Sequence, residues 1–182
     1  MSRELVRDLS LDTVLERIVE LARDQVQAEY AALAIRDENG VVVNFIQIGM
    51  SPDEVSQMPH FPRGKGLLGM LQHRDEVINI TDIKEDPRSA GFPEGHPAMS
   101  SMLGIPIVSG ERILGQIYLT NKKGGGKFTE DDARLMKTLA AYAAVAITNA
   151  QLYNHILKRD KTLNQQNQDL SLINDLAQTV AS

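Results

Sequence analysis

The chain has 182 residues, of which 42% are hydrophobic and 24% charged, a composition typical of a soluble globular protein. It has no cysteine, which excludes disulfides, thiolate metal sites and thioether-linked cofactors. The net charge of −5 and the 4% of aromatic residues disfavour a nucleic-acid surface. There is no apolar run of about 20 residues and no signal-peptide pattern, so we expect a cytoplasmic protein without membrane contact.

The first half of the chain predicts a helix followed by hairpins. Apolar residues on one stripe predict an amphipathic helix over 11–26, with Ser10 as its N-cap after a lead-in of residues 1–10. Asn39-Gly40 is a hairpin turn signal, and Pro52 opens a short helix. A second short helix is expected near Gly66. The predicted strands are 30–35, 41–49, 77–80, 101–108 and 113–121.

A glycine motif in the loop-rich middle mimics a nucleotide-binding fingerprint. Residues 64–69 spell G-x-G-x-x-G, and Asp82 follows the first of these glycines by eighteen positions. The motif needs a preceding strand, but a Pro-containing segment precedes it, and no helix after it could run far past His73. We therefore interpret the motif as a tight turn that caps a short helix. No hydrolytic or metal-binding signature is present elsewhere.

The C-terminal third predicts one long helix. Residues 129–182 contain neither Gly nor Pro, and Thr129 followed by acidic residues is a helix start signal. Such a helix would measure roughly 80 Å, so residues 155–182 must project beyond the domain. Heptad spacing predicts a coiled coil and a homodimer, although a frayed Gln/Asn-rich linker over 164–168 remains an alternative. The heptad positions are Leu152, Ile156, Leu163, Leu170, Ile173, Ala177 and Val180.

Residues 91–99 predict a lid-like loop that runs into a strand. The imidazole of His96 stands between Gly95 and Pro97, which stiffen its setting. Five of the seven methionines lie in this loop-rich middle, and methionine suits an adaptable lining around an apolar ligand. Ordinary core filling under long loops would use the same residues.

The order of these elements over residues 11–154 resembles a GAF domain. The matching segments are Leu67-Leu68-Gly69, Leu103-Gly104-Ile105-Pro106-Ile107, residues 115–122 and residues 128–132. The resemblance implies an α+β fold in which a central antiparallel sheet of five or six strands carries helices on one face and a loop-built ligand pocket on the other. It also implies a regulatory domain without catalysis of its own. Residues 150–153 resemble the exit from GAF domains of bacterial sensor histidine kinases, which implies a downstream output domain beyond Ser182.

Within that family, the chain is most similar to haem-binding GAF domains of mycobacterial oxygen- and redox-sensing kinases. The shared segments are residues 62–69, 91–93, 96–99 and 118–120. This resemblance implies a b-type haem with His96 as the iron ligand and Tyr118 on the distal side, lined by Met99 and Phe92. Neutral imidazole is a common proximal haem ligand, and a b-type haem needs no cysteine.

Two other functions stay open. GAF domains that bind cyclic nucleotides carry an N-K…F…D-E signature, and this chain has Asn121, Lys122, Phe128 and Asp132 but Ala133 in place of the last acid. The chain therefore remains compatible with a cyclic nucleotide or another metabolite as ligand. A ligand-free dimerisation spacer that only transmits motion is the remaining alternative. Bilin attachment and methionine-sulfoxide reduction, known in other GAF proteins, both need cysteine.

Overall fold

The computed structural model describes residues 3–57, 66–71, 77–92 and 96–181. Within these ranges, the burial of side chains is described for residues 10–173. The elements, in chain order, are α1 (Arg3–Val26), β1 (Ala28–Arg36), β2 (Val42–Ile48), α2 (Pro52–Gln57), α3 (Leu67–Met70), β3 (Ile78–Ile80), β4 (Met102–Ser109), β5 (Arg112–Lys122) and α4 (Glu130–Ala181). Within the described ranges, no helix is both long and apolar enough to span a membrane.

A five-stranded sheet of order β2-β1-β5-β4-β3 forms the centre of the molecule, and every neighbouring pair is antiparallel. This confirms the predicted antiparallel α+β fold. The β1–β2 hairpin closes where predicted, because Gly40 takes a φ of +80° and the Asp37 carboxylate accepts the N–H groups of Asn39 and Val41.

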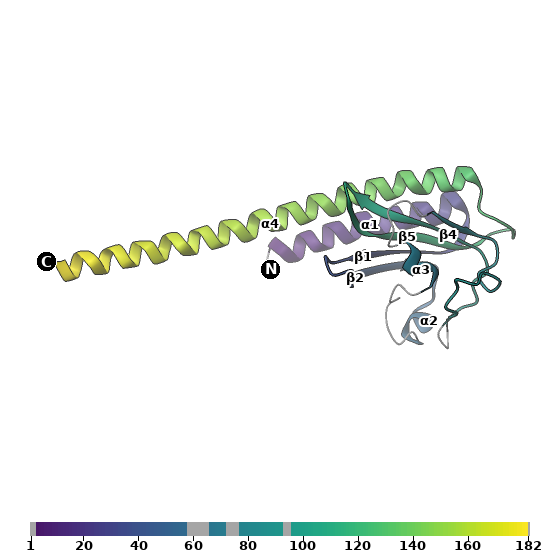
Figure 1. Ribbon diagram of the computed structural model, residues 1–182, viewed down its shortest axis with the longest axis horizontal. Helices are drawn as coiled ribbons and strands as arrows, with labels where there is room; N and C mark the ends of the chain where they lie inside the picture. The colour runs from purple at the N-terminus through teal and green to yellow at the C-terminus, as the bar shows by residue number, and fades with distance from the viewer. Residues whose placement is uncertain (1–2, 58–65, 72–76, 93–95, 182) are drawn as a thin grey trace.

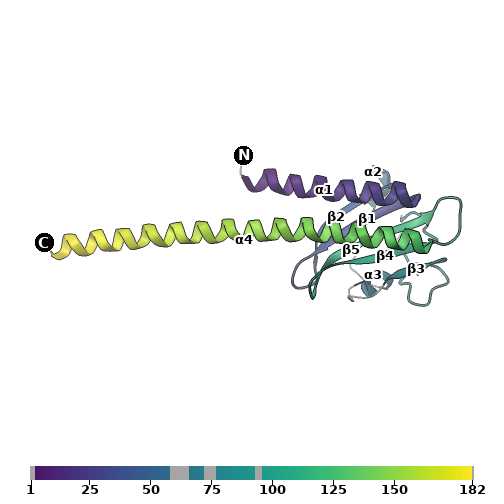
Figure 2. The same ribbon diagram turned by 90° about the horizontal axis from the view of Figure 1, so that it is seen from above.

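The two faces of the sheet are covered differently. Helices α1 and α4 lie side by side on one face, here called the helix face (Figure 2). The other face, here called the loop face, carries α2, α3 and the connecting loops (Figure 1). Each face of the sheet has its own buried apolar cluster, because successive side chains of a strand point to opposite faces. On β5, Ile117 and Leu119 pack under the helices, whereas Tyr118 packs under the loops.

The two long helices begin differently from each other. The prediction that Ser10 caps α1 is wrong, because α1 already starts at Arg3. Residues 3–9 are mostly good helix formers without Gly or Pro, and one serine does not stop such a run. The predicted N-cap of α4 is confirmed. The Thr129 hydroxyl accepts the N–H of Asp132 at 3.1 Å, and the Asp132 carboxylate accepts the N–H of Thr129 at 2.7 Å.

Helix α4 continues far beyond the sheet. It has 52 residues, which corresponds to about 78 Å, and residues 164–168 are helical as well. Among residues 130–173, whose side-chain burial the structure describes, Ile147 is the last buried one, and the helix beyond it projects from the domain (Figure 1). The proposed division at residues 154/155 remains a prediction, and the division at 10/11 falls inside α1.

Candidate functional site

The loop face holds a buried cluster centred on Tyr118. This side chain is 8% exposed, and the strand register places it between Ala32 of β1 and Gly104 of β4. A Cβ at position 104 would lie 2.7 Å from the Leu71 side chain, so glycine there lets Leu71 pack directly on the sheet. Burial raises the pKa of Tyr118, which keeps its phenol neutral.

Met99 joins the same cluster from the loop that precedes β4. Its side chain is 8% exposed, and Met102 beside Tyr118 is buried too. Helix α3 and the residue after it add Leu67 and Leu71 from the other side. The structure thus brings Met99 and Tyr118 into one apolar layer between sheet and loops.

His96 and Phe92 form a second group in the loop between β3 and β4. Their rings stack with centroids 4.9 Å apart and planes 24° apart. His96 Nδ1 lies 2.9 Å from the carbonyl oxygen of Pro97. A carbonyl can only accept, so Nδ1 carries the proton and donates, and in the neutral ring Nε2 keeps its lone pair. Histidines that bind metals have this arrangement, because the second nitrogen fixes the tautomer.

Helix α2 lies near this histidine. Hydrogen bonds from Ser51 lower the pKa of the Glu54 carboxyl, and the nearby His96 side chain makes a smaller electrostatic contribution of the same sign. Residues 93–95 lie outside the described residues, so the predicted lid loop is described only in part. In the described part of the chain, no hydrogen bond or ring contact joins the Phe92–His96 pair to Tyr118.

The sequence reasoning missed a row of buried polar side chains on the loop face. Gln116, Tyr118 and Thr120 alternate along β5 and are 1%, 8% and 3% exposed. Arg36 at the end of β1 is 7% exposed and donates to Gln116 Oε1 at 2.9 Å. Polar residues at every second position of an otherwise apolar strand were the available signal.

The residues of the cyclic-nucleotide signature hold the fold together. Lys122 Nζ donates to Asp132 Oδ2 and to the Val26 carbonyl, both at 2.7 Å, and lies 5.7 Å from the centre of the Phe128 ring. Asn121 accepts the Ser100 N–H and donates to the Ala98 carbonyl and to Glu29. These contacts join α1, the loop before β4, β5 and α4. Protein groups alone satisfy these side chains, without a nucleotide.

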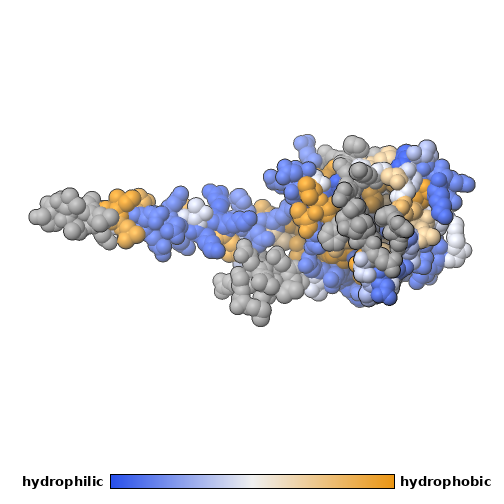
Figure 3. All heavy atoms as spheres, turned by 90° about the horizontal axis from the view of Figure 1, so that it is seen from below, coloured by the Kyte–Doolittle hydropathy of each residue, from blue (hydrophilic) through white to orange (hydrophobic). Residues whose placement is uncertain are grey.

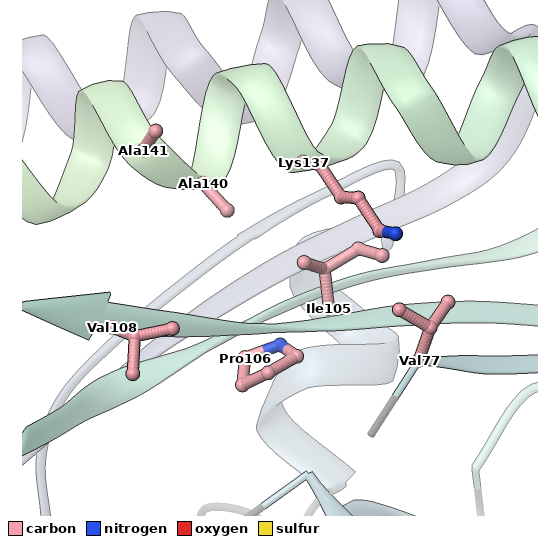
Figure 4. Close-up of a pocket in the computed structure, with 7 residues that line it drawn as sticks. All are labelled: Val77, Ile105, Pro106, Val108, Lys137, Ala140 and Ala141. Atoms are coloured by element: carbon pink, nitrogen blue, oxygen red, sulfur yellow. The ribbon is translucent and has the colours of Figure 1, made fainter. Parts of the chain in front are cut away.

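Two grooves lie away from the predicted site residues. One runs between α4 and β4, where the short β3 leaves part of β4 uncovered (Figure 4). The other lies between α1 and the edge strand β2, with Asp12, Glu16 and Glu20 along it. Among the described residues, no group of three or more His, Asp or Glu side chains could hold a metal ion. The first groove is lined by Val77, Ile105, Pro106, Val108, Lys137, Ala140 and Ala141.

The family follows from this arrangement of sheet, helix layer and loop layer. Residues 8–148 match the sequence model of the GAF domain. The match covers most of the chain and every strand of the sheet, so the chain belongs to the GAF domain family. GAF domains are sensory and regulatory domains.

The similar proteins carry the names of several different kinds of protein. The chain is 27% identical over 164 residues to the dual 3′,5′-cyclic-AMP and -GMP phosphodiesterase 11A of Takifugu rubripes, and the match covers 83% of this chain but only 18% of that relative. The GAF domain of a phosphoenolpyruvate-protein phosphotransferase from Coxiella burnetii superposes with a TM-score of 0.66 at 24% identity, covering 85% of this chain and 99% of that one. A GAF domain/HD domain protein from Geobacter sulfurreducens superposes with a TM-score of 0.63 at 18% sequence identity. That match covers 78% of this chain and 94% of the other. The two structural matches show the fold alone.

Proposed function

We propose that this chain is the regulatory module of a signalling protein, in which a small molecule held over the loop face changes the output through α4. The observation that carries the proposal is the continuity of α4. The helix contributes Met136 and Ile147 to the core, 0% and 1% exposed, and continues without a break beyond the domain. A shift of the sheet on ligand binding would therefore reach the far end of a rigid rod. We propose a histidine kinase as the output, on the resemblance of residues 150–153.

The projecting helix supports a parallel homodimer. Apolar side chains repeat at heptad spacing along its exposed surface, separated by hydrophilic ones (Figure 3). The same register continues back onto the domain, where Tyr142 and Val145 are 65% and 59% exposed. On the neighbouring α1, Val14 and Leu21 are seven residues apart and also exposed. A second copy would bury this long apolar strip, which a monomer leaves in water.

A b-type haem is the ligand that we propose to test first. The supporting observation is the bond from His96 Nδ1 to the Pro97 carbonyl, which leaves Nε2 as the atom able to bind iron. The haem would supply reversible binding of a diatomic gas or a one-electron redox change. Phe92 stacks on the imidazole and restrains its rotation. Met99 offers an apolar lining from the same loop, and the neutral Tyr118 phenol would donate a hydrogen bond to a bound gas.

Reconstitution with hemin tests this assignment. Wild type should take up hemin in a 1:1 ratio and show a Soret band. His96→Ala should lose stoichiometric binding or change the ferrous spectrum, while His155→Ala, an exposed histidine on α4, should behave as wild type. Tyr118→Phe should keep the haem and change its autoxidation rate. If wild type binds no hemin, or His96→Ala binds it identically, His96 is not a haem ligand.

A cyclic nucleotide is the second candidate, supported by the 27% identity to a cyclic-nucleotide phosphodiesterase. The partial signature is weaker evidence for a nucleotide than its residues suggest, because Lys122 and Asp132 bond to each other and stabilise the fold without one. Calorimetric titration with cyclic AMP and cyclic GMP tests this candidate. Heat of binding with either, in protein that takes up no hemin, would favour the nucleotide. No binding of hemin or nucleotide would favour another metabolite or the spacer function.

A further inference from the structure

Arg36 is a buried cation that has no anionic partner among the described residues. It stands at the end of β1, 7% exposed. Its Nη2 donates to Gln116 Oε1 at 2.9 Å and its Nη1 to the Gly40 carbonyl at 3.4 Å, while Nε has no hydrogen-bond partner. Both acceptors are neutral. Burial lowers the pKa of Arg36, although a guanidinium stays charged in proteins.

Five other arginines, all more exposed than Arg36, each pair with a carboxylate of their own. Arg112, for example, lies 3.3 Å from Glu38 although its side chain is 61% exposed. Arg159, exposed on α4, has no ion pair among the described residues. No described carboxylate pairs with Arg36, for which desolvation is far more costly. The five surface pairs are Arg17–Glu20, Arg23–Asp24, Arg88–Asp86, Arg112–Glu38 and Arg134–Asp131.

The unpartnered Nε belongs to a larger polar row. Gln116 shares the loop face with Tyr118 and Thr120, and the Thr120 hydroxyl is a second buried polar atom without a hydrogen bond. Three buried side-chain atoms of the described residues have no hydrogen bond, and two of them lie on the loop face; the third is Asn79 Oδ1 of β3. Buried polar atoms are normally satisfied, so the two on the loop face indicate groups that await a partner. At the Arg36 end, residues 38–41 form an exposed turn, and the guanidinium donates to the Gly40 carbonyl within that turn.

We infer that Arg36 and Gln116 form a subsite for an oxyanion, a carboxylate or a phosphate carried by the ligand of the loop face. The guanidinium presents its unused N–H donors in a planar fork, which matches the two oxygens of such a group. Gln116 fixes the fork by accepting from Nη2 and leaves Nε for the ligand. An oxyanion there supplies the missing counter-charge. The inference rests on the proposed function for the position of the ligand but requires neither haem nor a nucleotide.

Thermal unfolding at constant ionic strength tests the subsite with simple anions. Sodium phosphate and sodium acetate each replace sodium chloride, and the two arms distinguish a phosphate from a carboxylate. A free anion at ten times its Kd should raise the wild-type Tm by about 3 °C or more. Arg36→Gln should remove this rise. Arg112→Gln, a control near the same hairpin, should keep it because its ion pair is exposed.

A second variant keeps the test decisive if Arg36→Gln folds poorly. Arg36→Met removes the unpaired charge, so its Tm in chloride should equal or exceed that of wild type, and it should not respond to either anion. If wild type in phosphate and in acetate unfolds at the same temperature as in chloride, no oxyanion site exists. An undiminished response in Arg36→Met or Arg36→Gln would also overturn the assignment. Failure of hemin uptake leaves these outcomes unaffected, so the two proposals fail separately.

Discussion

Lys122 at the end of β5 and Asp132 in the first turn of α4 form an ion pair of 2.7 Å, with side chains only 18% and 13% exposed. The ammonium group also donates to the last carbonyl of α1, Val26, so one side chain joins both helices to the sheet.

Asp132→Asn should destabilise the domain by about 1–2 kcal/mol, because Lys122 loses its charged partner while most of the pair is shielded from water. Burial alone would raise the pKa of Asp132, but hydrogen bonds from Lys122 and Thr129 outweigh it and lower the pKa. The carboxylate therefore stabilises the fold above its unfolded pKa, and this part is lost as pH falls below about 4. Urea unfolding at pH 7 and pH 3.5 measures both effects.

Asp131→Asn is the matched control for that measurement, since Asp131 is 86% exposed and its ion pair is with the similarly exposed surface residue Arg134. It should change stability by less than about 0.5 kcal/mol at pH 7. If the two variants lose the same free energy of unfolding, the Lys122–Asp132 pair stabilises the fold no more than an exposed ion pair does.

Gly66→Ala should be far more destabilising than Gly91→Ala, although both glycines have positive φ angles, +58° and +74°. A Cβ at position 66 would lie 2.8 Å from the backbone nitrogen of Ala90, whereas one at position 91 meets nothing within 4 Å. The backbone strain of a positive φ should cost each variant about 1 kcal/mol of unfolding free energy. The clash at position 66 should cost Gly66→Ala at least as much again. Chemical denaturation of both proteins checks the difference, and similar midpoints would argue against the clash.

Truncation after Asn154 should leave a folded domain. Among residues 130–173 of α4, whose side-chain burial the structure describes, Ile147 is the last buried one, and the next residue, Thr148, donates a hydrogen bond from its hydroxyl to the Ser109 hydroxyl at 3.2 Å. The removed residues contribute to the proposed dimer and not to the core. Calorimetry should give one cooperative transition in the truncated protein. A broad or missing transition would mean that the projecting helix is needed for folding.

Leu163→Asp and Leu170→Asp together should convert the dimer to a monomer, because both positions lie on the heptad seam and are 53% and 63% exposed in one chain. Leu172→Asp is the matched control: it is 61% exposed but off the heptad, so its dimer should persist. Light scattering at high micromolar concentration reads out the mass. The proposed dimer interface would be contradicted if wild type is a monomer, or if Leu172→Asp dissociates the dimer as fully as the double variant does.

Local patterns were sufficient for most of the fold. Helix and strand periodicity, the Asn39-Gly40 turn and the Thr129 cap act within a few residues, and each is where predicted. Ser10 failed as a cap because a single serine competes weakly with a run of helix formers on either side. The stacked pair Phe92–His96 is also local, since four positions separate the two rings.

The sequence by itself determined the alternation of β1 and β5 and the heptad of α4, because these depend on periods of 2 and 3.5 residues. It also determined the length of α4, because no Gly or Pro interrupts the chain after Thr129. Only the tertiary structure decided which polar side chains become buried together. Arg36 and Gln116 are 80 positions apart, and their hydrogen bond exists because β1 and β5 pair in one register. Lys122 likewise meets Val26 and Asp132 only where α1, β5 and α4 converge. Desolvation acts on such groups in three dimensions, so no period in the chain encodes it.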